Sequence, residues 1–316
     1  MGWTARAAAA LVVVSPVASA QEPAATAGGS EPNIEVIDLM TEAYDRLTVP
    51  VTIGNHGPYD FMIDTGAQAT VVSRELADEL GLDDRMMSTL IGMASRREVE
   101  TAYVRDFALG MRMFDIMAAP LVAQDNIGTA NGVLGLDSLQ GQRVLLDFDN
   151  KTIEVADADT LGGNRGFEIV VRAREKFGQL IITQATLHGI DVAVILGTGT
   201  QSSIGNLALE RRLRSKRKLA EAQMTDINGA QELTNVRLVR DLRIGRARIS
   251  TIPLAFVDSP SFDALDLKDE PAILLGMSEL KLFRRVAIDF KDKRVLLDLP
   301  RNSNWYNGTR GGRFNY

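Results

Sequence analysis

Residues 61–71 read FMIDTGAQATV, and residues 194–204 read VILGTGTQSSI. When the two stretches are aligned, Thr65 matches Thr198 and Gly66 matches Gly199, whereas Asp64 is matched by Gly197. The similarity indicates an internal duplication. The second copy keeps the loop but has lost its acidic side chain.

The repeat extends well beyond these loops. Residues 49–73 resemble 183–206, residues 132–136 resemble 272–277, and residues 143–148 resemble 285–290. The separation between matched segments changes little, and insertions in surface loops explain the differences. We therefore expect two copies of one fold, lobe 1 at residues 36–157 and lobe 2 at 168–300, joined by a linker at 158–167.

Short apolar stretches alternate with Gly, Asn and Asp along both copies. Residues 47–53, 61–63, 144–148 and 152–155 are examples. Segments of this length between turn residues predict β-strands, so the fold class is all-β. Helices are expected only at residues 74–82 and 207–218, each directly after one of the repeated loops.

The ends of the chain differ from the two copies. Residues 1–20 combine one basic residue, Arg6, a short apolar run and an Ala-Ser-Ala ending, which is typical of a secretory signal peptide. That run is too short for a stable bilayer anchor, so we expect no membrane span in the mature chain. The predicted product is exported to a periplasm or the cell exterior after cleavage near Ala20, with a flexible leader at 21–35 and a tail at 301–316.

Composition excludes several classes of function. The net charge of −6 would become −7 once Arg6 is removed, and an acidic protein is a poor candidate for binding nucleic acid. The chain has no cysteine, which excludes thiol catalysis and thiolate metal sites. Its two histidines, His56 and His188, occupy matching turns, so we interpret both as turn residues and not as metal ligands. No cofactor is expected.

The Ile-Asp-Thr-Gly-Ala motif, followed about seventy residues later by Val133-Leu134-Gly135, resembles the retropepsin-like aspartic peptidases. The resemblance covers both copies. It implies two β-barrel lobes that face each other across a peptide-binding cleft, in one chain rather than in a homodimer of single lobes. A peptide or protein substrate is therefore expected. We expect a monomer, with a homodimer as the alternative.

In this family, two carboxylates from symmetry-related loops hold one water molecule and share one proton, because two like charges so close cannot both ionise. The resemblance implies that Asp64 is one of these catalytic carboxylates. Gly197 stands in the place of its partner and can act neither as a base nor as an acid. Asp191 is six positions earlier, before an apolar strand, and is no obvious replacement.

Three explanations for this glycine remain open. It could be a recent or engineered inactivation, lobe 2 could be a non-catalytic scaffold, or two chains could pair their first lobes. The rest of the loop pattern is retained. The resemblance implies that Thr65 and Thr198 brace the two loops across the lobe boundary, and Gly66 and Gly199 would let the loops approach closely.

Two further segments are candidates for flap hairpins that close over a bound peptide. Residues 89–95 and 224–230 each contain a glycine, and Asn-Gly in the second is a strong hairpin signal. The expected flap residues are Ile91, Gly92, Met93, Ile227, Asn228 and Gly229. The alternative is a pair of ordinary surface hairpins. The basic run at 211–218 is interpreted as a solvated helix face, with a contact to anionic lipid or an acidic partner as the alternative.

Together these features predict an aspartic endopeptidase that is impaired because Gly197 replaces the second catalytic aspartate. The main alternative is a pseudopeptidase that binds extended peptides in the cell envelope without cutting them. A structural envelope protein that uses the fold as a scaffold is a third possibility.

Overall fold

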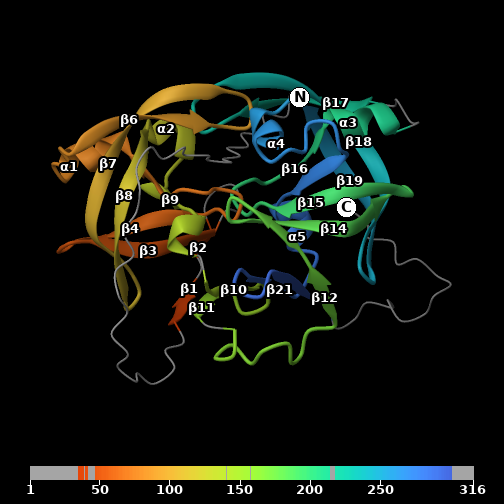
Figure 1. Cartoon of the computed structure of the whole chain (residues 1–316), viewed down its shortest axis with the longest axis horizontal. Helices are drawn as coiled ribbons and strands as arrows, with labels where there is room; N and C mark the ends of the chain where they lie inside the picture. Colours follow the sequence, from red (N-terminus) through yellow and green to blue (C-terminus); the bar gives the residue numbers. More distant parts are fainter. Residues whose placement is uncertain are drawn as a thin grey trace.

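The computed structural model of the chain describes residues 35–38, 40–41, 47–139, 141–156, 158–213 and 218–300. The predicted signal peptide, nearly all of the leader, the tail and residues 214–217 of the basic run lie outside these ranges. Within them the chain is almost entirely β-structure, so the predicted all-β fold class is confirmed. Figure 1 shows two lobes side by side, above a smaller sheet to which both contribute.

The sheet of lobe 1 contains eight strands in the described residues, in the order β2-β3-β4-β9-β5-β8-β7-β6, and an extra pairing of β3 with β7 closes it. Its strands are β2 (Met40–Thr41), β3 (Leu47–Ile53), β4 (His56–Ile63), β5 (Val71–Ser73), β6 (Arg85–Ile91), β7 (Arg96–Leu109), β8 (Arg112–Val122) and β9 (Gly132–Leu134).

Lobe 2 repeats this topology strand for strand, with the order β13-β14-β15-β20-β16-β19-β18-β17 and closure by β14 and β18. Its strands are β13 (Arg174–Lys176), β14 (Gln179–Leu187), β15 (Ile190–Leu196), β16 (Ser203–Asn206), β17 (Lys218–Thr225), β18 (Gln231–Ile244), β19 (Ala247–Val257) and β20 (Ala272–Leu275).

A third sheet joins the lobes, in the order β1-β11-β10-β21-β22-β12. Its strands are β1 (Glu35–Asp38), β10 (Arg143–Asp147), β11 (Thr152–Ala156), β12 (Ile169–Arg172), β21 (Arg285–Asp289) and β22 (Arg294–Asp298). At its centre β10 pairs with β21, with Arg143 opposite Asp289, Leu145 opposite Ala287 and Asp147 opposite Arg285. This register is symmetric about the Leu145–Ala287 pair, so the pseudo-two-fold axis that relates the lobes passes there.

The helices are short: α1 (Arg74–Glu79), α2 (Gln124–Ile127), the 3-10 helix η1 (Leu136–Ser138), α3 (Leu207–Arg212), α4 (Pro260–Ala264) and α5 (Met277–Leu280). In the described part of the chain, none of them has the length and hydrophobicity needed to span a membrane. The helix predicted at 207–218 extends only to Arg212 in the structure, and residues 214–217 lie outside the described ranges. Leu213 is already extended, with ψ of 124°, and Lys218 belongs to β17.

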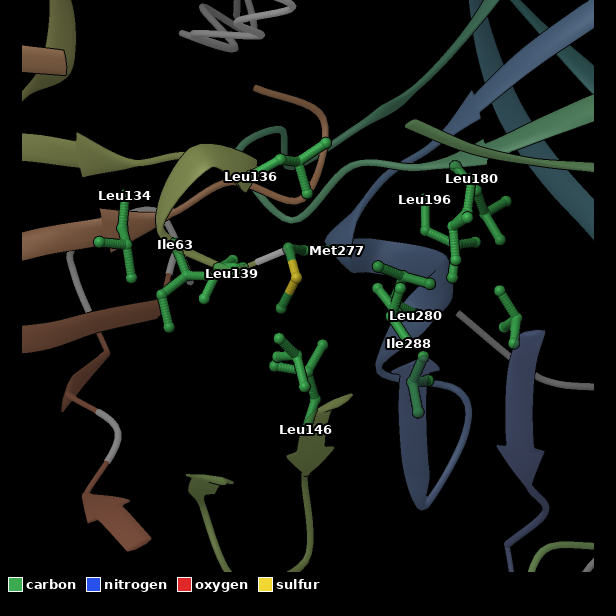
Figure 2. Packing of buried hydrophobic residues seen from close by; sticks show 14 of the residues in the cluster. Ile63, Leu134, Leu136, Leu139, Leu146, Leu180, Leu196, Met277, Leu280 and Ile288 are labelled. Carbon is green, nitrogen blue, oxygen red and sulfur yellow. The ribbon is translucent and has the colours of Figure 1, made fainter. Parts of the chain in front are cut away.

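One hydrophobic core runs through both lobes and the shared sheet. Figure 2 shows Ile63 and Leu134 of lobe 1 and Leu196 of lobe 2 on either side of Met277, with Leu146 of β10 below. All five side chains are buried. The ends of β4 and β15, from which the two repeated loops start, therefore rest on the same packed layer.

Candidate active site

The loop that contains Asp64 follows β4. This strand ends at Ile63, beside Leu134 of β9, and the Asp64 N–H donates to the Leu134 carbonyl at 3.1 Å. The Asp64 carboxylate accepts a hydrogen bond from the Gly66 N–H at 2.7 Å. Only 2% of Asp64 is exposed, so this carboxylate is held in place and largely shielded from solvent.

The loop of lobe 2 has the same backbone contacts. Strand β15 ends at Leu196, beside Leu275 of β20, and the Gly197 N–H donates to the Leu275 carbonyl at 3.0 Å. The Gly199 N–H, which corresponds to that of Gly66, donates across the lobe boundary to Asp64 Oδ1 at 3.2 Å. A donor that would serve a carboxylate at position 197 thus binds the carboxylate of lobe 1.

Two threonines connect the loops. The Thr65 hydroxyl donates to the Leu196 carbonyl at 2.8 Å, and the Thr198 hydroxyl donates to the Ile63 carbonyl at 2.7 Å. The Thr198 hydroxyl also accepts from the Thr65 N–H at 3.0 Å. Both threonines are buried. The lobe 1 loop is therefore already paired with the lobe 2 loop of its own chain.

Glycines make the close approach possible. A Cβ at Gly199 would overlap the Asp64 carboxylate, and a Cβ at Gly135 would overlap the backbone of Ala69. At Gly276 the added atom would lie 2.8 Å from the backbone carbonyl carbon of Ser202. Gly135 and Gly276 therefore pack directly against the two loops.

The space beside Gly197, the counterpart of Asp64, is filled by a leucine side chain. A Cβ built at Gly197 would lie 2.7 Å from Leu274 Cδ1 and 3.0 Å from Leu274 Cγ, closer than side-chain carbons pack. The Leu274 side chain is 4% exposed. Asp191 is at the opposite end of β15, paired with Thr186, and so does not replace the missing carboxylate.

Both flap candidates form hairpins. Residues 92–95 connect β6 to β7, and residues 226–230 connect β17 to β18. The two tips meet, as the upper part of Figure 1 shows. Asp226 accepts hydrogen bonds from the Ala94 N–H at 3.1 Å and the Ser95 hydroxyl at 2.7 Å, and the Asn228 amide donates to Ser95 Oγ at 2.9 Å. A Cβ at Gly92 would overlap the Asp226 carboxylate.

Each tip also packs into the opposite lobe. Met93 of lobe 1 belongs to a cluster that includes Leu274 of lobe 2, and Ile227 of lobe 2 belongs to a cluster that includes Val133 of lobe 1. Both tip residues are 1% exposed. The opposite lobe also binds the backbone of each tip. Ser261 Oγ of lobe 2 donates to the Gly92 carbonyl at 2.8 Å, and Asn126 Nδ2 of lobe 1 donates to the Ile227 carbonyl at 3.0 Å.

The two lobes support their loops with different polar groups. In lobe 1 the Thr70 hydroxyl bonds to Asp137 at 2.7 Å and accepts from the Gly135 N–H at 3.1 Å. In lobe 2 the Ser203 hydroxyl accepts from the Gly276 N–H at 2.9 Å and donates to the Glu279 carboxyl. Burial raises the pKa of Glu279 to about 7, although the Ser203 hydrogen bond opposes the shift.

Three residues of this region were not identified from the sequence: Leu274, Asp226 and Glu279. Leu274 lies in the repeated segment at 272–277, but its effect on position 197 depends on side-chain packing that the alignment does not show. Asp226 lies within the predicted flap segment 224–230 without having been singled out, and Glu279 carries no recognisable motif. Within the described ranges, no group of three or more His, Cys, Asp or Glu side chains is arranged to hold a metal ion.

The chain was compared with models of known protein families. Residues 49–138 match the model of a family described as aspartyl protease. The matched segment covers most of lobe 1 and includes Asp64, Thr65 and Gly66. The resemblance to retropepsin-like aspartic peptidases, first based on these residues, is confirmed.

Proposed function

We propose that this chain is an exported aspartic endopeptidase whose activity is impaired, because residues 49–138 of its first lobe match the aspartyl protease family. The observation that carries the proposal is the position of Asp64. Its carboxylate lies where the two loops meet and is bound by N–H groups from both of them. The equivalent position of lobe 2 is Gly197, which provides no second carboxylate.

In the proposed reaction, Asp64 takes a proton from a water molecule that attacks the scissile carbonyl of a peptide. Asp64 then returns this proton to the leaving amine as the C–N bond breaks. A second carboxyl group would polarise the carbonyl, and Gly197 cannot do so. Loss of one acid–base group costs about 10²–10⁴-fold in rate, and loss of half of a pair that acts as a unit can cost more.

The substrate we propose is an extended peptide. The tips of the two hairpins are buried in opposite lobes, so they have to separate before a chain can lie between them and the Asp64 loop. On closing again, their strands can add backbone hydrogen bonds to an extended segment and exclude water. Export to the cell envelope is part of the proposal and is supported by residues 1–20.

A second function, binding of extended peptides without cleavage, is favoured by the retained scaffold. The threonine contacts, the glycines under the loops and the crossed hairpin tips are all present without a second carboxylate. A binding protein needs these parts and does not need an acid at position 197.

The test compares the mature chain with its Asp64→Asn variant on a mixed peptide library between pH 3 and 7. Asparagine keeps the shape of the side chain but cannot act as a base. Slow cleavage that disappears in the variant would support the peptidase. Retention of peptides by both proteins without cleavage would support the binding protein, and neither cleavage nor retention would overturn both proposals.

A further inference from the structure

Leu274 occupies the position in lobe 2 that Val133 occupies in lobe 1. In the parallel pairing of β4 with β9, Met62 lies opposite Val133, and the next pair is Ile63 with Leu134. In β15 and β20, Ile195 lies opposite Leu274, and Leu196 opposite Leu275. The residues that precede the two loops therefore have equivalent neighbours, except that lobe 2 has a side chain one methylene longer.

This extra length lies where a side chain at position 197 would begin. The Cδ1, Cγ and Cδ2 atoms of Leu274 would lie 2.7, 3.0 and 3.3 Å from a Cβ at Gly197. The Leu274 side chain cannot easily rotate away from such a Cβ, because it is 4% exposed and packs in one cluster with Met93, Ile195 and Ile204. The backbone at Gly197 is not in the left-handed region, so conformation alone does not require glycine there.

The hydrogen bonds have changed in the same direction. In lobe 1 the Gly66 N–H binds the carboxylate of its own loop, Asp64. In lobe 2 the equivalent N–H of Gly199 has no such carboxylate and binds Asp64 instead. Both the space and the hydrogen-bond donor that would serve an acid at position 197 are thus in use.

We infer that Leu274 is a positioning residue whose side chain fills the space of the second carboxylate, so that lobe 2 is adapted to glycine at position 197. Restoring a working pair of catalytic carboxylates then requires Leu274→Val together with Gly197→Asp. The part of this inference that concerns packing is independent of catalysis. The part that concerns restored cleavage rests on the proposed function. Among the explanations for the glycine, the inference favours a non-catalytic scaffold over a recent single loss.

The packing is tested without any assay of activity, by measuring the unfolding temperature of Gly197→Ala in three backgrounds. In the natural chain we expect a decrease of about 3–8 °C, because a methyl group is forced against Leu274. In the Leu274→Val background the same change should be neutral or raise the unfolding temperature by about 1–3 °C, since alanine also restricts the unfolded chain.

The matched control is Leu275→Val, which removes the same methylene from the next residue, a fully buried leucine. Its carbonyl accepts from the Gly197 N–H, but its side chain is not among the atoms nearest to a Cβ at Gly197. In that background Gly197→Ala should be as harmful as in the natural chain, because shortening the Leu275 side chain leaves the Leu274 side chain in place against the new methyl group. Equal effects of Gly197→Ala in all three backgrounds would overturn the inference.

The catalytic part compares Gly197→Asp with Gly197→Asp/Leu274→Val on the peptide library. We expect the double variant to cleave about 10–100-fold faster, because misplacing a catalytic group by about 1 Å has effects of this size. Its rate should show a bell-shaped pH profile with two apparent pKa values, and Asp64→Asn should abolish it. Full activity of Gly197→Asp alone would contradict the role of Leu274. Rescue of the unfolding temperature without cleavage would support the packing and overturn the proposed proteolysis.

Discussion

Thr198 makes two hydrogen bonds across the lobe boundary through one hydroxyl group. Replacement by valine keeps the shape but leaves the Thr65 N–H and the Ile63 carbonyl without this partner in a buried site. Each unpaired buried group costs about 1–3 kcal/mol. We therefore expect Thr198→Val to lower the free energy of unfolding by about 2–4 kcal/mol, measured by urea denaturation.

Thr198→Ser provides the control, because serine retains the hydroxyl and loses only a methyl group. It should cost clearly less than valine. If serine were as harmful as valine, keeping the hydroxyl group would not protect stability, and the prediction for these hydrogen bonds would be wrong.

Glu279 makes stability depend on pH. Its pKa rises from 4.5 to about 7 on folding, so the folded state binds the proton more tightly than the unfolded state. The resulting stabilisation is complete below about pH 4.5 and is lost as the pH rises through 7. The difference between the two pKa values corresponds to about 3 kcal/mol.

Glu279→Gln tests this effect, since glutamine is neutral at every pH and can still bind the Ser203 hydroxyl. Unfolding measured between pH 4 and 8 should show a smaller loss of stability in the variant than in the natural chain. Parallel curves for the two proteins would mean that Glu279 does not cause the pH dependence.

The residues of the two loops could be predicted because the pattern that reveals them is local. Asp64, Thr65 and Gly66 are consecutive, and their copies recur in the same order. The contact of Leu274 with position 197 could not be predicted, because an apolar residue in an apolar strand carries no sign of what its side chain touches. The contacts of Asp226 could not be predicted either, because its partners in the other hairpin are more than 130 residues away in sequence.

Among the elements, strands were predicted more accurately than helices. The observed β3 (Leu47–Ile53) has the expected bounds, because its apolar residues are bordered by turn residues on both sides. Helix α3 ends at Arg212, although helix-favouring residues continue beyond it. Lys218 belongs to β17, which pairs with β18, and a pairing with a distant strand cannot be inferred from local propensity.

The crossing of the hairpin tips leads to a prediction at the scale of elements. Ile227→Ala removes a side chain that is 1% exposed in the opposite lobe, at a cost of about 2–4 kcal/mol. The closed tips should then open more often, and amide hydrogens in residues 92–95 and 226–230 should exchange roughly 30-fold faster or more. Hydrogen exchange followed by mass spectrometry measures this change in both hairpins.

Leu233→Ala is the control for this experiment, because Leu233 lies in the same hairpin but is 67% exposed. It should leave exchange at both tips nearly unchanged. Faster exchange in residues 226–230 alone would show that the tips do not hold each other closed.

At the scale of the whole molecule, the duplication predicted two lobes but not how they join. Nothing in residues 143–147 or 285–289 indicates that these strands pair with each other rather than within their own lobes. The pairing follows from symmetry: equivalent edge strands meet antiparallel at a two-fold axis. Arg143 and Asp289 form a buried ion pair there, at 2.6 Å.

The shared sheet and the crossed tips predict that the two lobes stay together after the connection between them is cut. A cleavage site for a specific protease, inserted between Asn164 and Arg165, lies in an exposed part of the segment between β11 and β12. After cleavage, the protein should elute from a size-exclusion column as a single species, at the same volume as the uncut chain. Its unfolding should now depend on protein concentration, because the pieces separate only on denaturation. Elution as two separate fragments would show that the linker, and not the β10–β21 pairing, holds the catalytic loops face to face.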